Sequence, residues 1–331
     1  MTETSTSSEA QPCTGDVASN HRDHYISQDF RGSLMFNKTS IQPVTLGTTG
    51  LGQREGADAS LATALLASPV HQIDTANMYA NGSSEALLGE AIHANGGLPS
   101  HKLIFSKVDQ DPTTGQFDGD RVKRSFEETM ARLGLETLPL LHFHDPYTIG
   151  VAEAMAPRGA VEALVSLREE GLVGAIGIAA GQRDLVEQYV STGVFDAVLT
   201  HNRYTLVDRS AEEILRLATE RNMMVFNAAP FGGGILARSG PHGAKYGYRT
   251  ASTDLLIFIE RLHEVCAAHS VNIAAAALHF SLKEPRIHST IVGIYSHRRL
   301  EELLTIVKSQ IPDTFWESVE ALGTPPASPT D

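Results

Sequence analysis

Short apolar runs and longer amphipathic stretches alternate along most of the chain. The apolar runs are rich in Val, Ile, Leu and Ala, which is typical of strands that are buried on both faces. Between them, apolar residues recur three and four positions apart, as in Leu255, Phe258, Ile259 and Leu262, and this spacing predicts helices packed on one face. The predicted strands are 43–46, 70–73, 103–107, 138–144, 175–179, 197–201, 224–228 and 290–293.

Eight strands with helices between them predict an α/β protein with a single (β/α)8 TIM barrel. The competing fold is a doubly wound parallel sheet, which would carry a GxGxxG motif after its first strand and an acidic residue further on. The turn at 47–52 reads Gly-Thr-Thr-Gly-Leu-Gly, which matches neither that motif nor the GxxxxGK[ST] phosphate loop. We therefore expect a barrel, in which these glycines let the backbone approach a ligand closely.

The two ends of the chain differ from the barrel pattern. Residues 1–27 are rich in Ser, Thr and acidic residues without any period, and predict a mobile N-terminal arm. A short hairpin at 32–40 would plug one end of the barrel, which we place at 28–322. The Pro-rich segment 323–331 predicts a short C-terminal tail.

Composition and charge narrow the functional classes. The chain has 331 residues, 42% of them hydrophobic, a net charge of −13 and a pI near 5.5. This balance argues against nucleic acid and anionic membranes as partners, and no apolar run reaches the roughly 20 residues that span a bilayer. Cys13 and Cys266 suggest no disulfide framework, and the N-terminus lacks the apolar centre of a signal peptide. We expect a cytoplasmic protein; its oligomeric state stays open, and a homo-oligomer is compatible with the sequence.

Four titratable residues stand at the ends of three predicted strands: Asp74 and Tyr79 follow the second strand, Lys107 ends the third and His144 ends the fourth. The carboxyl ends of barrel strands meet at one rim, so these side chains are expected to converge. There Lys107 would lower the pKa of Tyr79 from its usual value of about 10, and Asp74 would keep Lys107 charged. Tyr79 could then exchange a proton with a substrate oxygen that His144 orients. This set fits carbonyl and alcohol redox chemistry, which needs a nicotinamide cofactor to carry the hydride.

Two simpler interpretations stand beside this one. Taken alone, the 74–79 turn favours a structural interpretation, with a capping Asp74 and a half-buried aromatic Tyr79. The pair His142 and His144 lies two residues apart on a strand, so both imidazoles could reach one metal ion. Barrel hydrolases carry such a pair on their first strand, however, so we expect no metal site and interpret His142 as a core histidine hydrogen-bonded to a neighbour.

The same residues resemble the signature of the aldo-keto reductase superfamily. The resemblance rests on Asp74-Thr75-Ala76-x-x-Tyr79, Gly82-x-Ser84-Glu85-x-x-Leu88-Gly89, Phe105-Ser106-Lys107 and Phe143-His144-Asp145-Pro146. It runs in order from about residue 43 to residue 303. It implies a (β/α)8 barrel that uses NAD(P)(H) without a Rossmann domain, with Asp74, Tyr79, Lys107 and His144 as the catalytic residues.

Two further segments, 202–206 and 229–236, resemble the aldose 1-dehydrogenase branch, to which pyridoxal 4-dehydrogenase also belongs. This resemblance implies oxidation of an aldose at C1 to its lactone, with Tyr79 as the base. Two alternatives are oxidation of pyridoxal as a cyclic hemiacetal and general aldehyde or ketone reduction. An alternative of another class is a nucleotide-binding redox sensor with little turnover. A loop after the seventh strand, carrying Lys245, Tyr246 and Tyr248, is a candidate cover for the substrate.

The resemblance also implies a set of cofactor contacts. They are Gly47, Thr48, Asp74, Gln182, Phe231, Gly232, Gly233, Gly293, Tyr295, Arg299 and Glu302. NADP-preferring members carry a Lys where Gly293 stands, so we favour NAD over NADP, although Arg298 and Arg299 could hold a 2′-phosphate. The chain departs from the family at 179–182, where a Ser-Asn pair is usual, and at Ala228, where a stacking Tyr is usual. Asn77 replaces a commoner Pro, a change that we expect to be harmless.

Overall fold

The computed structural model describes residues 41–237 and 245–329. The predicted N-terminal arm and the hairpin at 32–40 lie outside the described residues, as do Cys13 and the last two residues of the predicted tail. Everything below concerns the described part of the chain.

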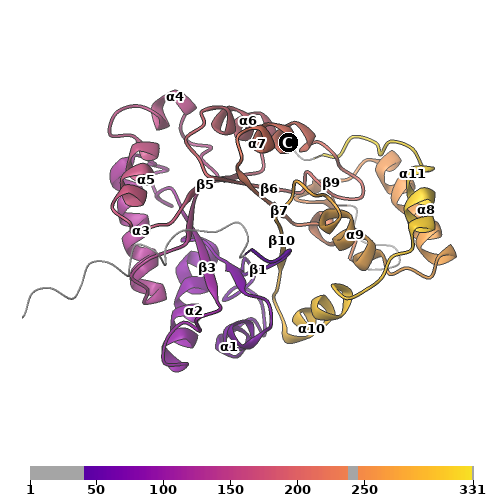
Figure 1. The fold of residues 1–331 in the computed structure, drawn as a ribbon, viewed down its shortest axis with the longest axis horizontal. Coiled ribbons are helices and arrows are strands. Elements are labelled where there is room, and N and C mark those ends of the chain that lie inside the picture. Colours follow the sequence, from indigo (N-terminus) through magenta and orange to yellow (C-terminus); the bar gives the residue numbers. More distant parts are fainter. Residues whose placement is uncertain (1–40, 238–244, 330–331) are drawn as a thin grey trace, which may run out of the picture. The chain divides into compact units, whose positions relative to one another are not determined.

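Eight parallel strands close a barrel in the order β1-β10-β7-β6-β5-β4-β3-β2, and Figure 1 shows the helices arranged around them. The strands are β1 (Val44–Gly47), β2 (Gln72–Asp74), β3 (Leu103–Val108), β4 (Leu140–His144), β5 (Ile176–Ala180), β6 (Ala197–His201), β7 (Met224–Ala228) and β10 (Ser289–Gly293). This confirms the predicted TIM barrel, and its closure excludes the doubly wound sheet. Several predicted strand ends differ from the observed ends by one or two residues. Sequence pattern defines the ends of helices and strands less well than their centres.

The helices follow the strands in alternation. They are α1 (Ala59–Ala67), α2 (Ser83–Ala94), α3 (Gly119–Leu133), α4 (Val151–Ala154), α5 (Ala160–Glu169), α6 (Arg183–Ser191), α7 (Glu212–Glu220), α8 (Thr253–Ala268), α9 (Ile273–Leu282), α10 (His297–Ile306) and α11 (Asp313–Glu320). Two 3-10 turns, η2 (Tyr79–Gly82) and η3 (Gly232–Gly234), and a hairpin of β8 (Lys245–Tyr246) with β9 (Arg249–Thr250) lie in the loops.

Helix α3 illustrates how the sequence sets these elements. Its N-cap Asp118 accepts a hydrogen bond from the backbone N–H of Arg121 at 2.9 Å, and Gly134 ends it in the left-handed conformation with φ 66°. Between the caps, Val122 and Phe126 are buried, as their spacing predicts. The polar face of the same helix supplies the groups that hold the functional turn described below.

The apolar core has two parts, one outside the strands and one inside the barrel. Polar side chains lie at the carboxyl-terminal rim. The larger part lies between strands and helices, and it contains the buried Cys266 of α8. A smaller cluster fills the interior, where the rings of Phe105 and Phe226 meet edge to face at 5.7 Å. The interior is therefore packed below the rim, as it is in TIM barrels generally.

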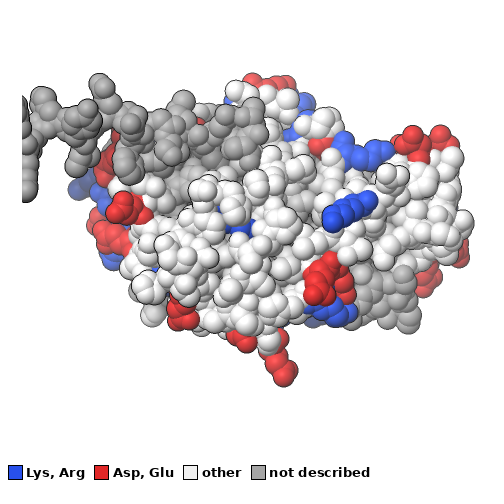
Figure 2. Space-filling view, turned by 60° about the horizontal axis from the view of Figure 1, so that its bottom comes forward, with Lys and Arg blue, Asp and Glu red and all other residues white. Residues whose placement is uncertain are grey.

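The surface and the helix lengths give two further observations. On the face drawn in Figure 2, Lys and Arg side chains lie in small groups among acidic and uncharged residues.

Among the described residues, no single helix combines the length and apolar character needed to cross a bilayer. The pair α8 and α9, bent by 98° where they meet, passes that test together on length and composition alone.

A buried lysine holds the opposite, amino-terminal end of β3. The ammonium of Lys102 donates to the carbonyl oxygens of Leu65, Ser68 and Val70 and to the Ser68 hydroxyl. Burial lowers the pKa of Lys102 to about 8, so the amine is still mostly protonated at neutral pH. Since the carbonyl groups belong to the end of α1 and the segment that enters β2, this one side chain joins α1 and the starts of β2 and β3.

We predict that Lys102→Met destabilises the protein by about 2–3 kcal/mol, because buried carbonyl oxygens lose a charged donor that water cannot replace. The measurement is urea unfolding followed by circular dichroism. Lys123→Met, at an exposed position on α3, is the matched control and should change stability by less than about 0.5 kcal/mol. Equal effects of the two variants would contradict the proposed contribution of the Lys102 contacts.

Candidate active site

The turn between β2 and α2 carries the first two residues of the predicted catalytic set. Its backbone continues the pairing with β3, because Thr75 N–H donates to the Phe105 carbonyl at 2.9 Å and Asn77 N–H to the Lys107 carbonyl at 3.1 Å. Ala80 and Asn81 then adopt the left-handed conformation, with φ of 51° and 53°. Residues other than glycine seldom adopt this conformation, and those that do often lie at functional sites. The turn therefore holds Tyr79 over the end of β3.

Asp74 and Lys107 form a buried ion pair at the centre of this rim. The Lys107 Nζ lies 2.7 Å from Asp74 Oδ2 and donates a second hydrogen bond of 2.7 Å to the Thr75 carbonyl. Burial acts to lower the pKa of Lys107, but Asp74 and Tyr79 outweigh it, so the pKa is raised and the amine stays charged. The side chains of the pair are only 1% and 4% exposed, which places this charge in a site with little water.

The phenol of Tyr79 lies beside that ammonium. The Lys107 Nζ is 4.7 Å from the centre of the Tyr79 ring. Burial raises the pKa of Tyr79, Lys107 lowers it, and Asp74 raises it again, so the net direction is upward. The expectation that Lys107 brings the pKa below its usual value is therefore wrong for the protein without ligands. The lysine acts in the expected direction, but loss of hydration around the phenolate has the larger effect.

His144 completes the set and brings in a residue that the sequence analysis missed. Its ring lies 5.7 Å from the Tyr79 ring at an angle of 79°, and its Nδ1 lies 2.7 Å from Asp109 Oδ1. Burial acts to lower the pKa of His144, but Asp109 and Asp145 outweigh it and raise the pKa. Asp109 stands two positions after Lys107, and the two-residue period of a strand is the signal that could have identified it.

The structure thus brings Asp74, Tyr79, Lys107 and His144 together. His142 pairs in register with Lys107 but lies two residues before the end of β4. His142 is buried against Phe226, with ring centres 5.9 Å apart, and its Nδ1 has no hydrogen-bond partner. The expected hydrogen bond from His142 to a neighbour is therefore wrong for this nitrogen, because the small residue Gly177 and an aromatic ring surround it. Among the described residues, no group of three His, Cys, Asp or Glu side chains could hold a metal ion.

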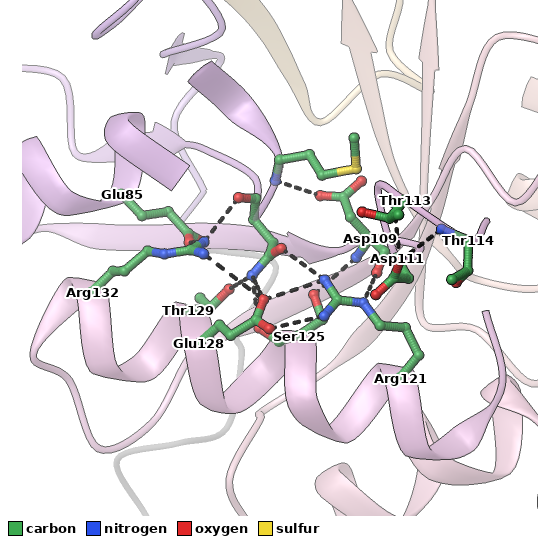
Figure 3. A network of polar contacts seen from close by, with 12 residues as sticks. Glu85, Asp109, Asp111, Thr113, Thr114, Arg121, Ser125, Glu128, Thr129 and Arg132 are labelled. Atoms are coloured by element: carbon green, nitrogen blue, oxygen red, sulfur yellow. Dashed lines mark hydrogen bonds and ion pairs between the residues drawn. The ribbon is translucent and has the colours of Figure 1, made fainter. Parts of the chain in front are cut away.

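A polar network fixes the turn to α3, and Figure 3 shows its labelled members on α3, among them Arg121, Glu128 and Arg132. Asn77 donates to the Ser125 carbonyl at 3.0 Å and to Glu128 at 3.1 Å, and it accepts from Arg121 at 3.2 Å. Arg132 donates to the Asn77 carbonyl at 2.9 Å. The replacement of a commoner Pro by Asn77 is thus accompanied by a full set of partners for its amide, which a pattern of residues could not reveal.

Residues predicted to bind the cofactor occupy the ends of β1 and β10. Gly47 pairs in register with both Asp74 and Gly293, which joins the two glycines to the catalytic rim. The hydroxyl of Thr48 donates to the Asp74 carbonyl at 3.0 Å and accepts from Ser84 at 2.8 Å. Thr48 is fully buried, and its backbone N–H and carbonyl are also hydrogen-bonded, to Asp74 and Leu51, so the whole residue supports the turn.

Two ring–cation pairs contain three of the remaining predicted contacts. The guanidinium of Arg299 lies 4.6 Å from the centre of the Phe231 ring, and Glu302 lies 3.5 Å from Arg299 and 2.9 Å from Arg298. Tyr295 is covered in the same way by Arg54, at 4.4 Å, a residue that the sequence analysis missed. Gln182 is exposed at the start of α6.

A small cavity lies at the carboxyl-terminal ends of β5 and β6. It is lined by Gly181, His201, Asn202, Tyr246, Gly247, Tyr248, Arg249 and Pro329. The Asn202 Oδ1 is buried without a hydrogen-bond partner, which suits a ligand that donates a hydrogen bond. Gly233 lies so close to Gly247 that a Cβ would be 2.7 Å from its carbonyl, and Gly247 N–H donates to the Gly232 carbonyl at 3.0 Å. The predicted cover, the β8–β9 hairpin, is thus joined to the glycine turn of η3.

Comparisons with known proteins agree with this geometry. The profile of the Aldo/keto reductase family matches residues 43–324. A pyridoxal 4-dehydrogenase of Microbacterium luteolum is 28% identical over 327 residues, which cover 86% of this chain and 94% of that protein. A D-threo-aldose 1-dehydrogenase of Pseudomonas sp is 31% identical over 202 residues, 60% of this chain and 61% of that protein.

The fold has solved counterparts as well. An aldo-keto reductase from Bacillus halodurans in its holo form superposes with a TM-score of 0.71, covering 85% of this chain and 92% of its own, at 19% identity. The family match spans nearly the whole barrel and includes every strand that carries a predicted catalytic residue. This chain therefore belongs to the aldo/keto reductase family.

Proposed function

We propose that this protein is an NAD(P)-dependent dehydrogenase that oxidises an aldose at C1 to its lactone. The observation that carries the proposal is the buried Lys107 ammonium, held 2.7 Å from Asp74 and lying over the Tyr79 ring. The similarity to an aldose 1-dehydrogenase supports the choice of substrate. Gly47, Phe231, Gly293, Tyr295 and Arg299 would hold the dinucleotide.

In the proposed oxidation the substrate loses its hydroxyl hydrogen as a proton and the hydrogen on C1 as a hydride. A bound nicotinamide would supply the acceptor for that hydride. Tyr79 as phenolate takes the hydroxyl proton, Lys107 stabilises the phenolate, and Asp74 keeps Lys107 in place. His144 donates a hydrogen bond to the same oxygen. Because the pKa of Tyr79 is raised, the phenolate is scarce at neutral pH, so the rate of oxidation should increase with pH.

Tyr79→Phe should reduce kcat by about 10²–10⁴-fold, because the substrate proton loses its acceptor. Nucleotide affinity, measured by quenching of protein fluorescence, should change by less than about twofold. The matched control is Tyr189→Phe, which removes a phenol that is buried elsewhere in the barrel and has no hydrogen-bond partner. A Tyr79→Phe enzyme that keeps more than roughly a tenth of wild-type kcat would sink the proposed role of this phenol.

The substrate itself is tested by following cofactor reduction at its absorbance maximum. Free aldoses should be oxidised faster than simple alcohols, and the product should be a lactone. Pyridoxal is the second candidate, since the pyridoxal 4-dehydrogenase relative covers 86% of this chain. Faster oxidation of pyridoxal than of every aldose would replace the first proposal with the second. Tight nucleotide binding without turnover on any substrate would instead support a redox sensor.

We also propose that NAD is the preferred nucleotide. Glu302 lies within 3.5 Å of both Arg298 and Arg299, so its carboxylate competes with a 2′-phosphate for the same guanidinium groups. The side of Gly293 is open, because a Cβ there would meet nothing within 4 Å. A longer cationic side chain at this position would therefore reach solvent-exposed space beside these residues.

Gly293→Lys should shift the ratio of NADP to NAD affinity toward NADP by roughly tenfold, about 1.4 kcal/mol, because it adds a cation without steric cost. The measurement is fluorescence titration with each nucleotide. Gly150→Lys is the matched control, since its side is equally open and its φ of −75° accepts a side chain. An unchanged ratio in Gly293→Lys would contradict the placement of the adenosine end of the cofactor beside β10.

A further inference from the structure

We infer that Asp109 is a positioning residue for His144: its carboxylate holds the imidazole by Nδ1 and leaves Nε2 for the reacting oxygen. This inference rests on the proposed function, because it assigns His144 a share in the handling of the substrate oxygen. It adds a residue outside the four that the family resemblance implies.

The two oxygens of Asp109 have separate partners. Oδ1 lies 2.7 Å from His144 Nδ1, and Oδ2 accepts the backbone N–H of Met78 at 2.9 Å. Met78 directly precedes Tyr79, so one carboxylate fixes the distance between the segment that carries the phenol and the ring that carries the imidazole. Asp109 is only 4% exposed, and charge-assisted hydrogen bonds of this length are the stronger ones in proteins.

Asp109 is itself held in place on the backbone side, as Figure 3 shows. Its N–H donates to the Ser125 hydroxyl at 3.0 Å, and its carbonyl accepts from Arg121 Nε at 2.9 Å. The guanidinium of Arg121 also donates to Asn77 and Glu128. The position of the carboxylate is therefore determined by α3 and by the catalytic turn together, and His144 adapts to it.

This contact decides both the tautomer and the charge of His144. A carboxylate at Nδ1 requires a proton on that nitrogen, so a neutral His144 has an acceptor at Nε2 and a charged one has a donor there. The charged and titratable groups that face His144 are Lys107 from β3, Asp74 from β2, Tyr79, Asp109, Asp145, His142 and His201. Lys107 disfavours the charged imidazole, and Asp109 and Asp145 favour it.

Asp145 does not replace Asp109 in this arrangement. Its Oδ2 is 3.7 Å from His144 Nε2, beyond hydrogen-bond distance, and its side chain is 37% exposed, against 6% for Asp109. Water screens the exposed carboxylate more strongly. Asp109 is thus the acid that fixes the orientation of the ring.

The competing interpretation is that Asp109 only caps the turn through Met78 N–H. Asp109→Asn separates the two, because an amide oxygen can still accept from Met78 N–H. The substitution removes the negative charge. The NH2 group of the new amide would donate to His144 Nδ1 and so favour the tautomer with the proton on Nε2. Asp111→Asn is the matched control: Asp111 also accepts backbone N–H groups, from Thr113 and Thr114, at the far side of the same loop.

The first test needs no substrate. The imidazole signals of the full-length protein are followed by NMR against pH, and the His144 signal is assigned with His144→Gln. In the wild type His144 should titrate above the usual pKa of about 6.5, and in Asp109→Asn its midpoint should fall by about one to three pH units. Asp111→Asn should leave it unchanged. A His144 titration that is the same in wild type and Asp109→Asn overturns the inference, whether or not the protein oxidises aldoses.

The second test follows kinetics with the substrate identified above. Asp109→Asn should lower kcat by roughly tenfold or more. The pH at which kcat changes should shift in the same direction as the midpoint of the His144 titration measured by NMR. Nucleotide affinity should stay within about twofold of the wild type. A variant with more than half of wild-type kcat and an unshifted profile also overturns the inference. If the NMR coupling holds but the wild type turns over no aldose or pyridoxal, the proposed function fails while the Asp109–His144 coupling stands.

Discussion

The ion pair between Lys107 and Asp74 is the interaction on which the rest of the rim depends. Two buried charges cost several kcal/mol each in lost hydration, which their attraction repays only when the geometry is close and the remaining hydrogen bonds are made. Here the ammonium has the Thr75 carbonyl as a second acceptor, and parallel pairing of β2 with β3 fixes both backbones. One Asp74 oxygen, Oδ1, remains buried without a partner. The pair is therefore costly for stability, and its retention fits a functional role.

Hydrogen bonds and ion pairs hold the residues around the Lys107–Asp74 pair in place. The turn that leaves β2 contains left-handed residues, and its amide, carbonyl and N–H groups are bound by Arg121, Arg132 and Asp109 rather than by water. Glu85 and Glu128 in turn neutralise these arginines. A network in which nearly every member has a partner holds one conformation better than isolated contacts do. The phenol and the imidazole consequently have a fixed separation before any ligand arrives.

The sequence was sufficient for the barrel and for the four titratable residues, because both follow from local pattern. Strand runs repeat along the chain, and functional groups stand where those runs end. The supporting contacts follow no such pattern. Arg121 contacts Asn77 across 44 positions, and the unpartnered oxygen of Asn202 lies beside the cavity because of the fold, not because of a local sequence pattern. The direction in which the pKa of Tyr79 shifts depends on how much water the folded site excludes. Residue types alone do not specify that amount.

The contact between Gly233 and Gly247 joins the η3 turn to the β8–β9 hairpin, whose residues line part of the cavity. At that point two backbones touch with no side chain between them. Adding one methyl group to Gly233 would force the two segments apart. A change in the length or side chains of the hairpin can therefore alter the size of the cavity, whereas the contact at its base tolerates no added atom.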